Sequence, residues 1–453
     1  MKRIGIRATS LVMVIILFLV GMAVFFVDYG RNASTWVAYP YNLNIYSKGV
    51  LTRSGTIRSS DGSTLLNISG GVTYYADDAT LRRATLHAVG DTGDNIATGI
   101  LRSYKGQLIG YDLVNGVYNP FDRGNTVTLT IDADVNLAAY NALGSYNGTV
   151  GVYNYKTGQV LCMVSKPTFD PGNPPDLTSD AYDSVYVNRL FSGLYTPGSV
   201  FKVITTAAAI DTIPNLDAME FTCEGGAMIG DEWVACQGYH GTIDIHEAFA
   251  VSCNAAYGVL ANELGADVLT QYAEAAGVGE QFQVQGVYSA KGNFDVTKAD
   301  ENDLAWAGIG QYTDVVNPMQ FLIYIGAIAN GGRSPTPYYV RNVVTSYGLP
   351  TYMHIFSAPQ KSMMSEETAN TLQDMMRNNA LTAYTSFAGW ELCAKTGTAQ
   401  LDNAEPHSWF VGFLDDADMP LAFVVVVENG GFGSSTAIPV ARAVLEAAAS
   451  LYQ

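Results

Sequence analysis

The stretch Tyr195–Lys202, YTPGSVFK, followed directly by the alanine-rich run VITTAAAI, decides the fold of this 453-residue chain. Pro197 and Gly198 indicate a turn, and the apolar run after them predicts a buried helix. Ser199 is then expected in the first helical turn, where unpaired backbone N–H groups and the positive end of the helix dipole favour a developing anion. Lys202 lies about one turn further on, so both side chains project from one helix face. A hydroxyl beside an amine can be a nucleophile with its base, although Ser-x-x-Lys is short enough to occur often by chance.

Two further short polar motifs follow Ser199 along the chain. Ser252 and Asn254 form a Ser-x-Asn motif in a largely apolar stretch that predicts a helix. Polar side chains in such a stretch must face a cleft or find partners. Lys395-Thr-Gly-Thr, residues 395–398, lies in a predicted strand. A glycine in this strand lets a ligand approach the backbone closely.

Similar stretches elsewhere in the chain are interpreted as structural. Residues 156–158 repeat Lys-Thr-Gly and residues 145–147 repeat Ser-x-Asn, but both precede Ser199 and fall in predicted turns. Glu366 opens a predicted helix over 363–377, where an acidic residue ordinarily complements the helix dipole.

In the region from Thr126 onward, strand-like segments occur at both ends and helix-like segments lie between them. Predicted strands are 127–131, 149–155, 159–165, 392–399, 409–414 and 421–428, and predicted helical stretches are 135–143, 200–276 and 437–452. This order predicts an α+β domain whose central antiparallel sheet is built from the two ends, flanked by terminal helices, with an all-helical insertion.

The N-terminal 125 residues divide into an anchor and a spacer. Residues 8–27 are uniformly apolar and follow Lys2, Arg3 and Arg7. As a helix they rise roughly 30 Å, the thickness of the hydrocarbon core. The basic flank predicts a cytoplasmic N-terminus, with everything after Asp28 outside. A cleaved signal peptide is the alternative, but the apolar run is long and no small-x-small site follows it. We therefore expect an anchor at 1–29, a β-rich membrane-proximal domain at 30–125 and the main domain at 126–453.

Composition excludes several classes of function. A net charge of −18 argues against a nucleic-acid partner, which needs clustered Lys and Arg. Five cysteines without Cys-x-x-Cys, and five histidines without the paired spacings of zinc sites, argue against a metal site, and no cofactor is expected. Cys223 and Cys236 flank a Gly-rich loop, and a disulfide between them stays open.

The three motifs in this order resemble those of the penicilloyl-serine transferases, which include penicillin-binding proteins and serine β-lactamases. The resemblance to class B penicillin-binding proteins extends further, over 55–66, 124–132, 152–171, 308–311, 330–332 and 407–413. It departs from the usual pattern at Ser59 and Ser60, where an Asp-Arg pair is common, at Ala394, where Gly is common, and at Val200, where Thr is common. None of these changes removes a group that the chemistry needs. The resemblance implies a β-lactamase-like transpeptidase domain preceded by a β-rich pedestal and one transmembrane helix.

The resemblance also implies roles for the motif residues. Ser199 would be the nucleophile on the D-Ala-D-Ala end of a peptidoglycan stem peptide, with Lys202 as the candidate base and Ser252 as proton relay. Asn254 would hold the substrate amide, and Lys395, Thr396 and Thr398 the terminal carboxylate beside Gly397. The backbone N–H groups of Ser199 and Thr398 would form the oxyanion hole. β-Lactams are the inhibitors implied, and a polytopic glycosyltransferase of the elongation or division machinery is the implied partner.

Two other classes of protein are alternatives on the same motifs. One is a hydrolase, either a D,D-carboxypeptidase or a β-lactamase, and the other is an inactive β-lactam-binding scaffold or sensor. An uncleaved anchor, a sizeable first domain and the lack of a well-placed deacylating Glu disfavour the hydrolase. The complete motif set disfavours the inactive scaffold.

Overall fold

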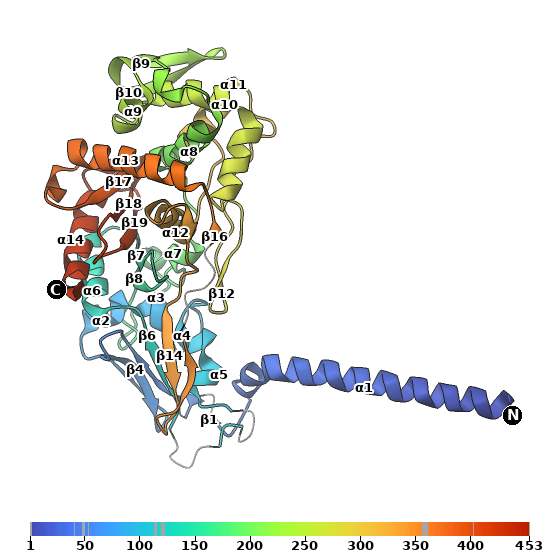
Figure 1. Cartoon of the computed structure of the whole chain (residues 1–453). Coiled ribbons are helices and arrows are strands. Elements are labelled where there is room, and N and C mark those ends of the chain that lie inside the picture. Colours follow the sequence, from blue (N-terminus) through green and yellow to red (C-terminus); the bar gives the residue numbers. More distant parts are fainter. Residues whose placement is uncertain are drawn as a thin grey trace.

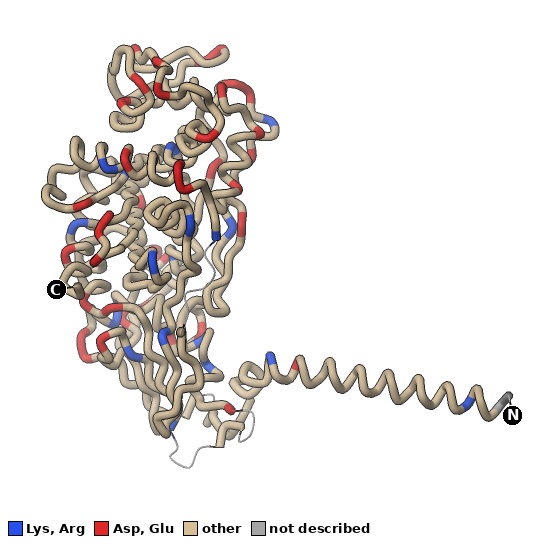
Figure 2. Tube along the Cα trace, viewed as in Figure 1, with Lys and Arg blue, Asp and Glu red and all other residues tan. Residues whose placement is uncertain are grey.

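The computed structural model describes residues 2–39, 41–47, 50–52, 54–112, 116–118, 123–355, 361–401 and 403–452. Helix α1, Lys2–Val37, projects away from the body of the molecule (Figure 1). Its segment Ile4–Val37 is long and apolar enough to cross a membrane, and its most apolar window is fully exposed. Figure 2 shows a long stretch of α1 without charged residues, and the sequence has none between Arg7 and Asp28. The predicted apolar helix is therefore present, and it extends to Val37.

A five-stranded antiparallel sheet forms the centre of the C-terminal domain. Its strand order is β17-β18-β19-β7-β8, so the last three strands of the chain pair with the first two of the domain. The strands are β7 Gly148–Asn154, β8 Val160–Lys166, β17 Leu392–Leu401, β18 Ala404–Leu414 and β19 Leu421–Val427. Every residue of β7 and of β19 is buried, which explains the uninterrupted apolar sequence of β19. The predicted sheet is confirmed.

Helices cover both faces of this sheet. On one side lie α6, Ala133–Leu143, and α14, Ala437–Ala449, which pack on each other. On the other side lies α12, Pro318–Ala329, every residue of which is buried. Helix α13, Glu366–Ala383, packs along β17 at the edge. Glu366 opens α13 as the sequence predicts.

The insertion between β8 and β17 is mainly helical but not all-helical. Besides α12 and α13, its helices are α7 Arg189–Ser192, α8 Lys202–Thr212, α9 Ile245–Ala250, α10 Asn254–Ala275 and α11 Glu301–Ile309. Residues 221–243, expected to be helical, instead form the antiparallel hairpin of β9, Phe221–Ile229, and β10, Glu232–Ile243, at the far end of the molecule (Figure 1). The turn glycine Gly230, with φ of 60°, reverses the chain there.

The membrane-proximal part is a mixed structure whose sheet extends into the C-terminal domain. A six-stranded sheet has the order β15-β14-β6-β3-β4-β5. Its strands are β3 Thr56–Arg58, β4 Thr64–Ser69, β5 Val72–Tyr75, β6 Thr126–Leu129, β14 Val340–Val344 and β15 Pro350–Met353. Strand β3 pairs in parallel with β6 across the predicted boundary at residue 125. Short helices accompany this sheet, so the pedestal is not purely β: α2 Ala79–Ala84, α3 Leu86–Val89, α4 Ile100–Ser103 and α5 Lys105–Leu108.

The remaining elements are short. Two-residue strands pair as β1 Tyr46–Ser47 with β2 Val50–Leu51, β11 Gln283–Val284 with β12 Val287–Tyr288, and β13 Arg333–Ser334 with β16 Lys361–Ser362. Single 3-10 turns are η1 Asp180–Tyr182, η2 Gly198–Val200, η3 Leu216–Ala218, η4 Thr385–Phe387 and η5 Ser450–Tyr452. Of these, η2 carries Ser199 and leads directly into α8.

Candidate active site

Ser199 lies in a 3-10 turn that precedes α8, rather than in the helix itself. The turn η2 covers Gly198–Val200, and α8 begins at Lys202. Gly198 opens the turn with φ of 55°, a conformation that disfavours side chains with a Cβ. The Ser199 side chain is half-buried, while Val200 after it is fully buried. The turn therefore holds Ser199 at the surface of a packed layer.

The nucleophile turn lies directly against the strand that carries the third motif. A Cβ added to Gly198 would come within 2.6 Å of the Thr398 carbonyl oxygen. A Cβ added to Gly397 would meet Val200 Cγ1 at 2.8 Å. These close approaches are possible because both residues are glycine. The structure therefore brings the first and third motifs together.

Lys202 connects the first motif to the second. Its side chain is completely buried, and its Nζ donates hydrogen bonds to the Ser252 carbonyl at 2.7 Å, to Ser252 Oγ at 3.2 Å and to Asn254 Oδ1 at 2.8 Å. Nζ also lies 5.1 Å from the centre of the Tyr257 ring. An amine with this many acceptors and no solvent is held in a fixed position.

The second motif forms the tight connection between two helices. Ser252 lies between α9 and α10 with φ of 56°, a left-handed conformation that is uncommon for a residue other than glycine. Backbone strain of this kind is typical of functional sites. Asn254 begins α10, and its Nδ2 donates to the Ala235 carbonyl of β10 at 3.0 Å. The hairpin therefore positions the amide that faces Lys202.

The two lysines of the site are both buried, which lowers their pKa values. Burial lowers the pKa of Lys202 to about 7, and the thiols of Cys236 and Cys253 act in the opposite direction. Burial, and then repulsion from the Lys202 charge, place the pKa of Lys395 well below its usual value. Burial is thus the main cause of the lowered pKa of Lys202.

The third motif is held in place by two neighbours, Tyr384 and Asn379, that the sequence analysis did not select. Tyr384 Oη accepts a hydrogen bond from the Thr396 backbone N–H at 2.9 Å and lies 3.1 Å from Thr396 Oγ1. Asn379 Nδ2 donates to Tyr384 Oη and to the Ala394 carbonyl, both at 3.0 Å. Lys395 Nζ donates to the Thr396 carbonyl at 3.1 Å. Both positioning residues come from α13 or its end, a relation that only the tertiary fold creates.

A single pocket is lined by residues from all three motifs. Its wall is formed by Ser199, Gln237, Ser252, Asn254, Trp306, Ile309, Gln311, Thr396, Gly397, Thr398 and Gln400. Lys202 and Lys395 lie behind this wall. Gln237, Trp306 and Gln400 were not expected from the sequence. Gln311 follows Gly310, whose carbonyl accepts a hydrogen bond from the Gly198 N–H at 2.8 Å. A Cβ added to Gly310 would lie 2.3 Å from the Gly198 oxygen. Gly310 was therefore the signal in the sequence that this segment lies against the nucleophile turn.

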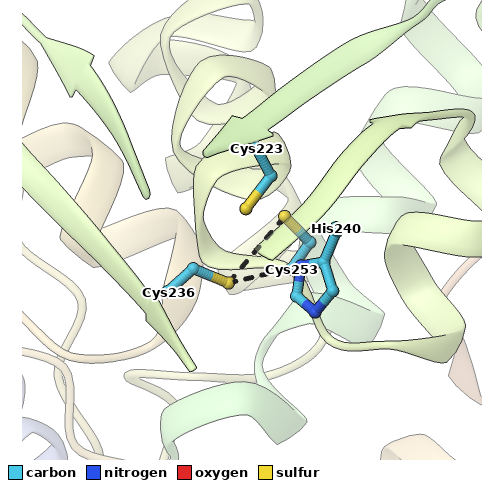
Figure 3. A group of neighbouring side chains, drawn as sticks. All are labelled: Cys223, Cys236, His240 and Cys253. Atoms are coloured by element: carbon cyan, nitrogen blue, oxygen red, sulfur yellow. Dashed lines mark hydrogen bonds between the residues drawn. The ribbon is translucent and has the colours of Figure 1, made fainter. Parts of the chain in front are cut away.

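A cluster of thiols lies behind the second motif. It consists of Cys223, Cys236, His240 and Cys253 (Figure 3). Each side chain offers one potential ligand atom, and these four atoms lie within 4.8 Å of one another. All five cysteines of the chain are free, so Cys223 and Cys236 are not paired in this structure. The spacing of these residues did not predict the cluster, because the hairpin and the α9–α10 turn assemble it from distant positions.

Known proteins are similar to this chain in sequence and in fold. Residues 148–446 match the family described as the penicillin binding protein transpeptidase domain. Peptidoglycan D,D-transpeptidase PbpA of Mycolicibacterium smegmatis is 30% identical over 386 residues, which is 77% of this chain and 77% of that protein. Stage V sporulation protein D of Bacillus subtilis is 29% identical over 348 residues, covering 71% of this chain and 53% of that protein.

Solved structures agree with this match. The imipenem acyl-enzyme complex of penicillin-binding protein A from M. tuberculosis superimposes with a TM-score of 0.77 at 25% identity, covering 88% of this chain and 99% of that one. The resemblance inferred from the motifs is confirmed. The chain belongs to the penicillin-binding protein transpeptidase family, as a class B penicillin-binding protein.

Proposed function

We propose that this chain is a peptidoglycan D,D-transpeptidase that cross-links stem peptides through an acyl-enzyme on Ser199. The observation that carries this proposal is the completely buried Lys202. Its Nζ binds Ser252 and Asn254 beside a pocket that also contains Ser199 and Thr398. A serine hydroxyl needs both a base and an anion trap to act as a nucleophile at neutral pH.

Acylation begins when Ser199 Oγ attacks the carbonyl between the two terminal D-alanines. Neutral Lys202 accepts the hydroxyl proton, and the Ser199–acyl ester bond forms as the D-Ala–D-Ala amide bond breaks. Ser252, within hydrogen-bonding distance of Lys202 Nζ, relays a proton to the leaving amine. The terminal D-alanine then departs with a neutral amine.

The rest of the motif set binds the charges of the substrate and of the transition state. The backbone N–H groups of Ser199 and Thr398 stabilise the oxyanion, and each such donor typically contributes about 3–4 kcal/mol. Lys395, Thr396 and Thr398 receive the terminal carboxylate, next to Gly397, which leaves room for the substrate backbone. Asn254 holds the substrate amide.

An amine of a stem peptide on a neighbouring strand then attacks the ester. The cross-linking amide bond forms as the ester bond breaks, and the Ser199 hydroxyl is restored. The described residues that line the pocket include no Asp or Glu, the groups that would activate water in a hydrolase. This favours transfer to an amine over hydrolysis. β-Lactams acylate Ser199 in place of the stem peptide, in line with the acyl-enzyme complexes solved for penicillin-binding protein A.

The location of the reaction follows from α1. With basic residues before the apolar segment 8–27, the N-terminus lies in the cytoplasm and the catalytic domain on the outer face of the bacterial membrane. A polytopic glycosyltransferase that makes glycan strands is the partner proposed for α1 and the membrane-proximal part, by analogy with the family.

Substitution of the nucleophile tests the proposal. Ser199→Ala in the full chain is expected to abolish covalent labelling by a fluorescent β-lactam, because no ester can form, while the melting temperature stays close to that of the wild type. Ser145→Ala, at the exposed serine of the repeated Ser-x-Asn motif, is the control and should label normally. Labelling that survives Ser199→Ala would refute the assignment.

A further inference from the structure

We propose that Cys223, Cys236, His240 and Cys253 bind a Zn²⁺ ion in a closed tetrahedral site that fastens the Ser252–Asn254 turn to strand β10. The site is distinct from the acylation chemistry of the proposed function, because none of its four ligands lines the pocket. Three thiolates and one imidazole form a donor set typical of structural zinc sites, which use all four positions for protein ligands.

The spacing of the ligand atoms fits a tetrahedron. Zn–S bonds of about 2.3 Å and a Zn–N bond of about 2.0–2.1 Å place two sulfur ligands about 3.8 Å apart and a sulfur–nitrogen pair about 3.6 Å apart. Cys236 Sγ lies 3.9 Å from Cys253 Sγ and 3.6 Å from His240 Nδ1. All four ligand atoms fall within 4.8 Å of one another, and Figure 3 shows the three sulfurs and the imidazole converging on one point.

An irregular stretch of β10 brings two of the ligands together. Between Ala235 and Gly241, strand β10 contains more residues than the facing part of β9, so the ladder register shifts twice. Such bulges redirect side chains. Cys236 and His240 both lie in this bulged stretch, and Cys223 is the residue of β9 that pairs with Gly241. The backbone irregularity and the ligand cluster therefore occur at the same place.

Backbone N–H groups already point at two of the sulfurs. The Asn254 N–H donates to Cys236 Sγ at 3.2 Å, and the Ala256 N–H donates to Cys253 Sγ at 3.5 Å. Donors of this kind orient metal-bound thiolates and stabilise their charge. Cys253 is also the N-cap residue of α10, where the helix dipole favours a negative group. Cys223 Sγ lies 3.5 Å from the Gly238 carbonyl oxygen, a contact that the bound ion would replace.

The ion would couple the hairpin to the catalytic turn. Cys253 stands between Ser252 and Asn254, the two residues that bind Lys202 Nζ. Ser252 has a left-handed backbone, which persists only when the surroundings hold it. A ligand at Cys253 bound to the same ion as Cys236 and His240 supplies that restraint.

Metal analysis of the full chain tests this proposal. We expect the protein, purified in detergent with a reducing agent and without chelator, to contain a single equivalent of zinc by elemental analysis. Cys223→Ala and His240→Ala should lose that zinc. The matched controls are Cys162→Ala, at a buried cysteine of the central sheet, and His246→Ala, at an exposed histidine of α9, and both should retain it.

Cobalt replacement keeps the test valid if the ligand variants fail to fold. Wild-type protein stripped with a chelator and reloaded with Co²⁺ should show the intense visible and thiolate-to-metal charge-transfer bands of tetrahedral cobalt–sulfur ligation. Stripping should also lower the melting temperature by several degrees, and Zn²⁺ should restore it.

Three results would overturn the proposal. They are wild-type protein without zinc whose five cysteines all alkylate, a disulfide within the cluster in non-reducing mass spectrometry, and reloaded protein without the cobalt–thiolate bands. The labelling test with Ser199→Ala does not depend on any of these three results. The zinc site can therefore be refuted while the proposed function stands, and the reverse also holds.

Discussion

The buried environment of Lys202 prepares its amine to act as a base. The side chain is fully buried, and among the described residues its Nζ donates hydrogen bonds only to neutral oxygens of Ser252 and Asn254. The lack of a carboxylate partner leaves burial as the dominant influence on its pKa. A neutral amine near pH 7 is the form that can accept a proton from Ser199.

The rate of acylation should follow the titration of Lys202. Because its pKa is about 7 and only the neutral amine acts as a base, the second-order rate constant for β-lactam acylation should fall about tenfold per pH unit below pH 7 and level off above it. Stopped-flow labelling between pH 5.5 and 9 measures this profile.

The control for the pH profile is Lys202→Arg. Arginine stays protonated, so this variant should acylate roughly 10²–10⁴-fold more slowly and show no inflection near pH 7. An unchanged inflection in the arginine variant would assign the titration to another group.

At the scale of elements, the contact between η2 and β17 sets the active-site geometry. Gly198 is held with a positive φ and in close contact with the Thr398 carbonyl. Trp409 of β18 supports the same contact, since its Nε1 donates to the Thr196 carbonyl at 3.1 Å. The nucleophile therefore takes its position from the sheet rather than from α8.

Gly198→Ala should disturb the nucleophile more than it disturbs the fold. The new methyl group would lie 2.6 Å from the Thr398 oxygen, so the turn must move, and we expect β-lactam acylation to slow at least tenfold. Gly62→Ala is the control, because Gly62 has φ of 91° but open space around its Cβ position, which leaves only backbone strain of about 1–3 kcal/mol. Equal acylation rates for the two variants would contradict this role of Gly198.

The hairpin β9–β10 is the element that sequence analysis assigned wrongly. Its residues alternate between buried and exposed along much of β9, and Gly225, Gly226 and Gly230 interrupt any helix. These local signals favoured strands. The alanine-rich helices on either side concealed them when the whole stretch 200–276 was read as one segment.

At the scale of the whole molecule, the two parts of the chain on either side of residue 125 share one sheet. Strand β6 lies between β14 and β3, so removal of residues 1–125 leaves β6 as an open edge. The domain boundary at residue 125 stays a prediction, and the sheet shows that the two sides of this boundary are not structurally independent.

Truncation of the chain tests this dependence. Residues 126–453 alone should give lower soluble yield and a melting temperature several degrees below that of residues 28–453, because unpaired strand edges promote aggregation and the buried side chains of β3 and β4 are lost. The longer chain is the control, since it lacks only the apolar segment and keeps the contact of Ser34 with Gly106. Equal melting temperatures would contradict the prediction.

The sequence by itself determined the apolar helix α1, the strands at both ends of the C-terminal domain and the order of the three motifs. These depend on local composition and on residue types that the chemistry requires, such as the hydroxyl of Ser199 and the amine of Lys202. Only the tertiary structure decided that Lys202 is buried against Asn254, that Tyr384 holds Thr396, and that Cys223, Cys236, His240 and Cys253 meet. Burial and hydrogen bonding between distant segments arise from packing, which no local pattern of residues encodes.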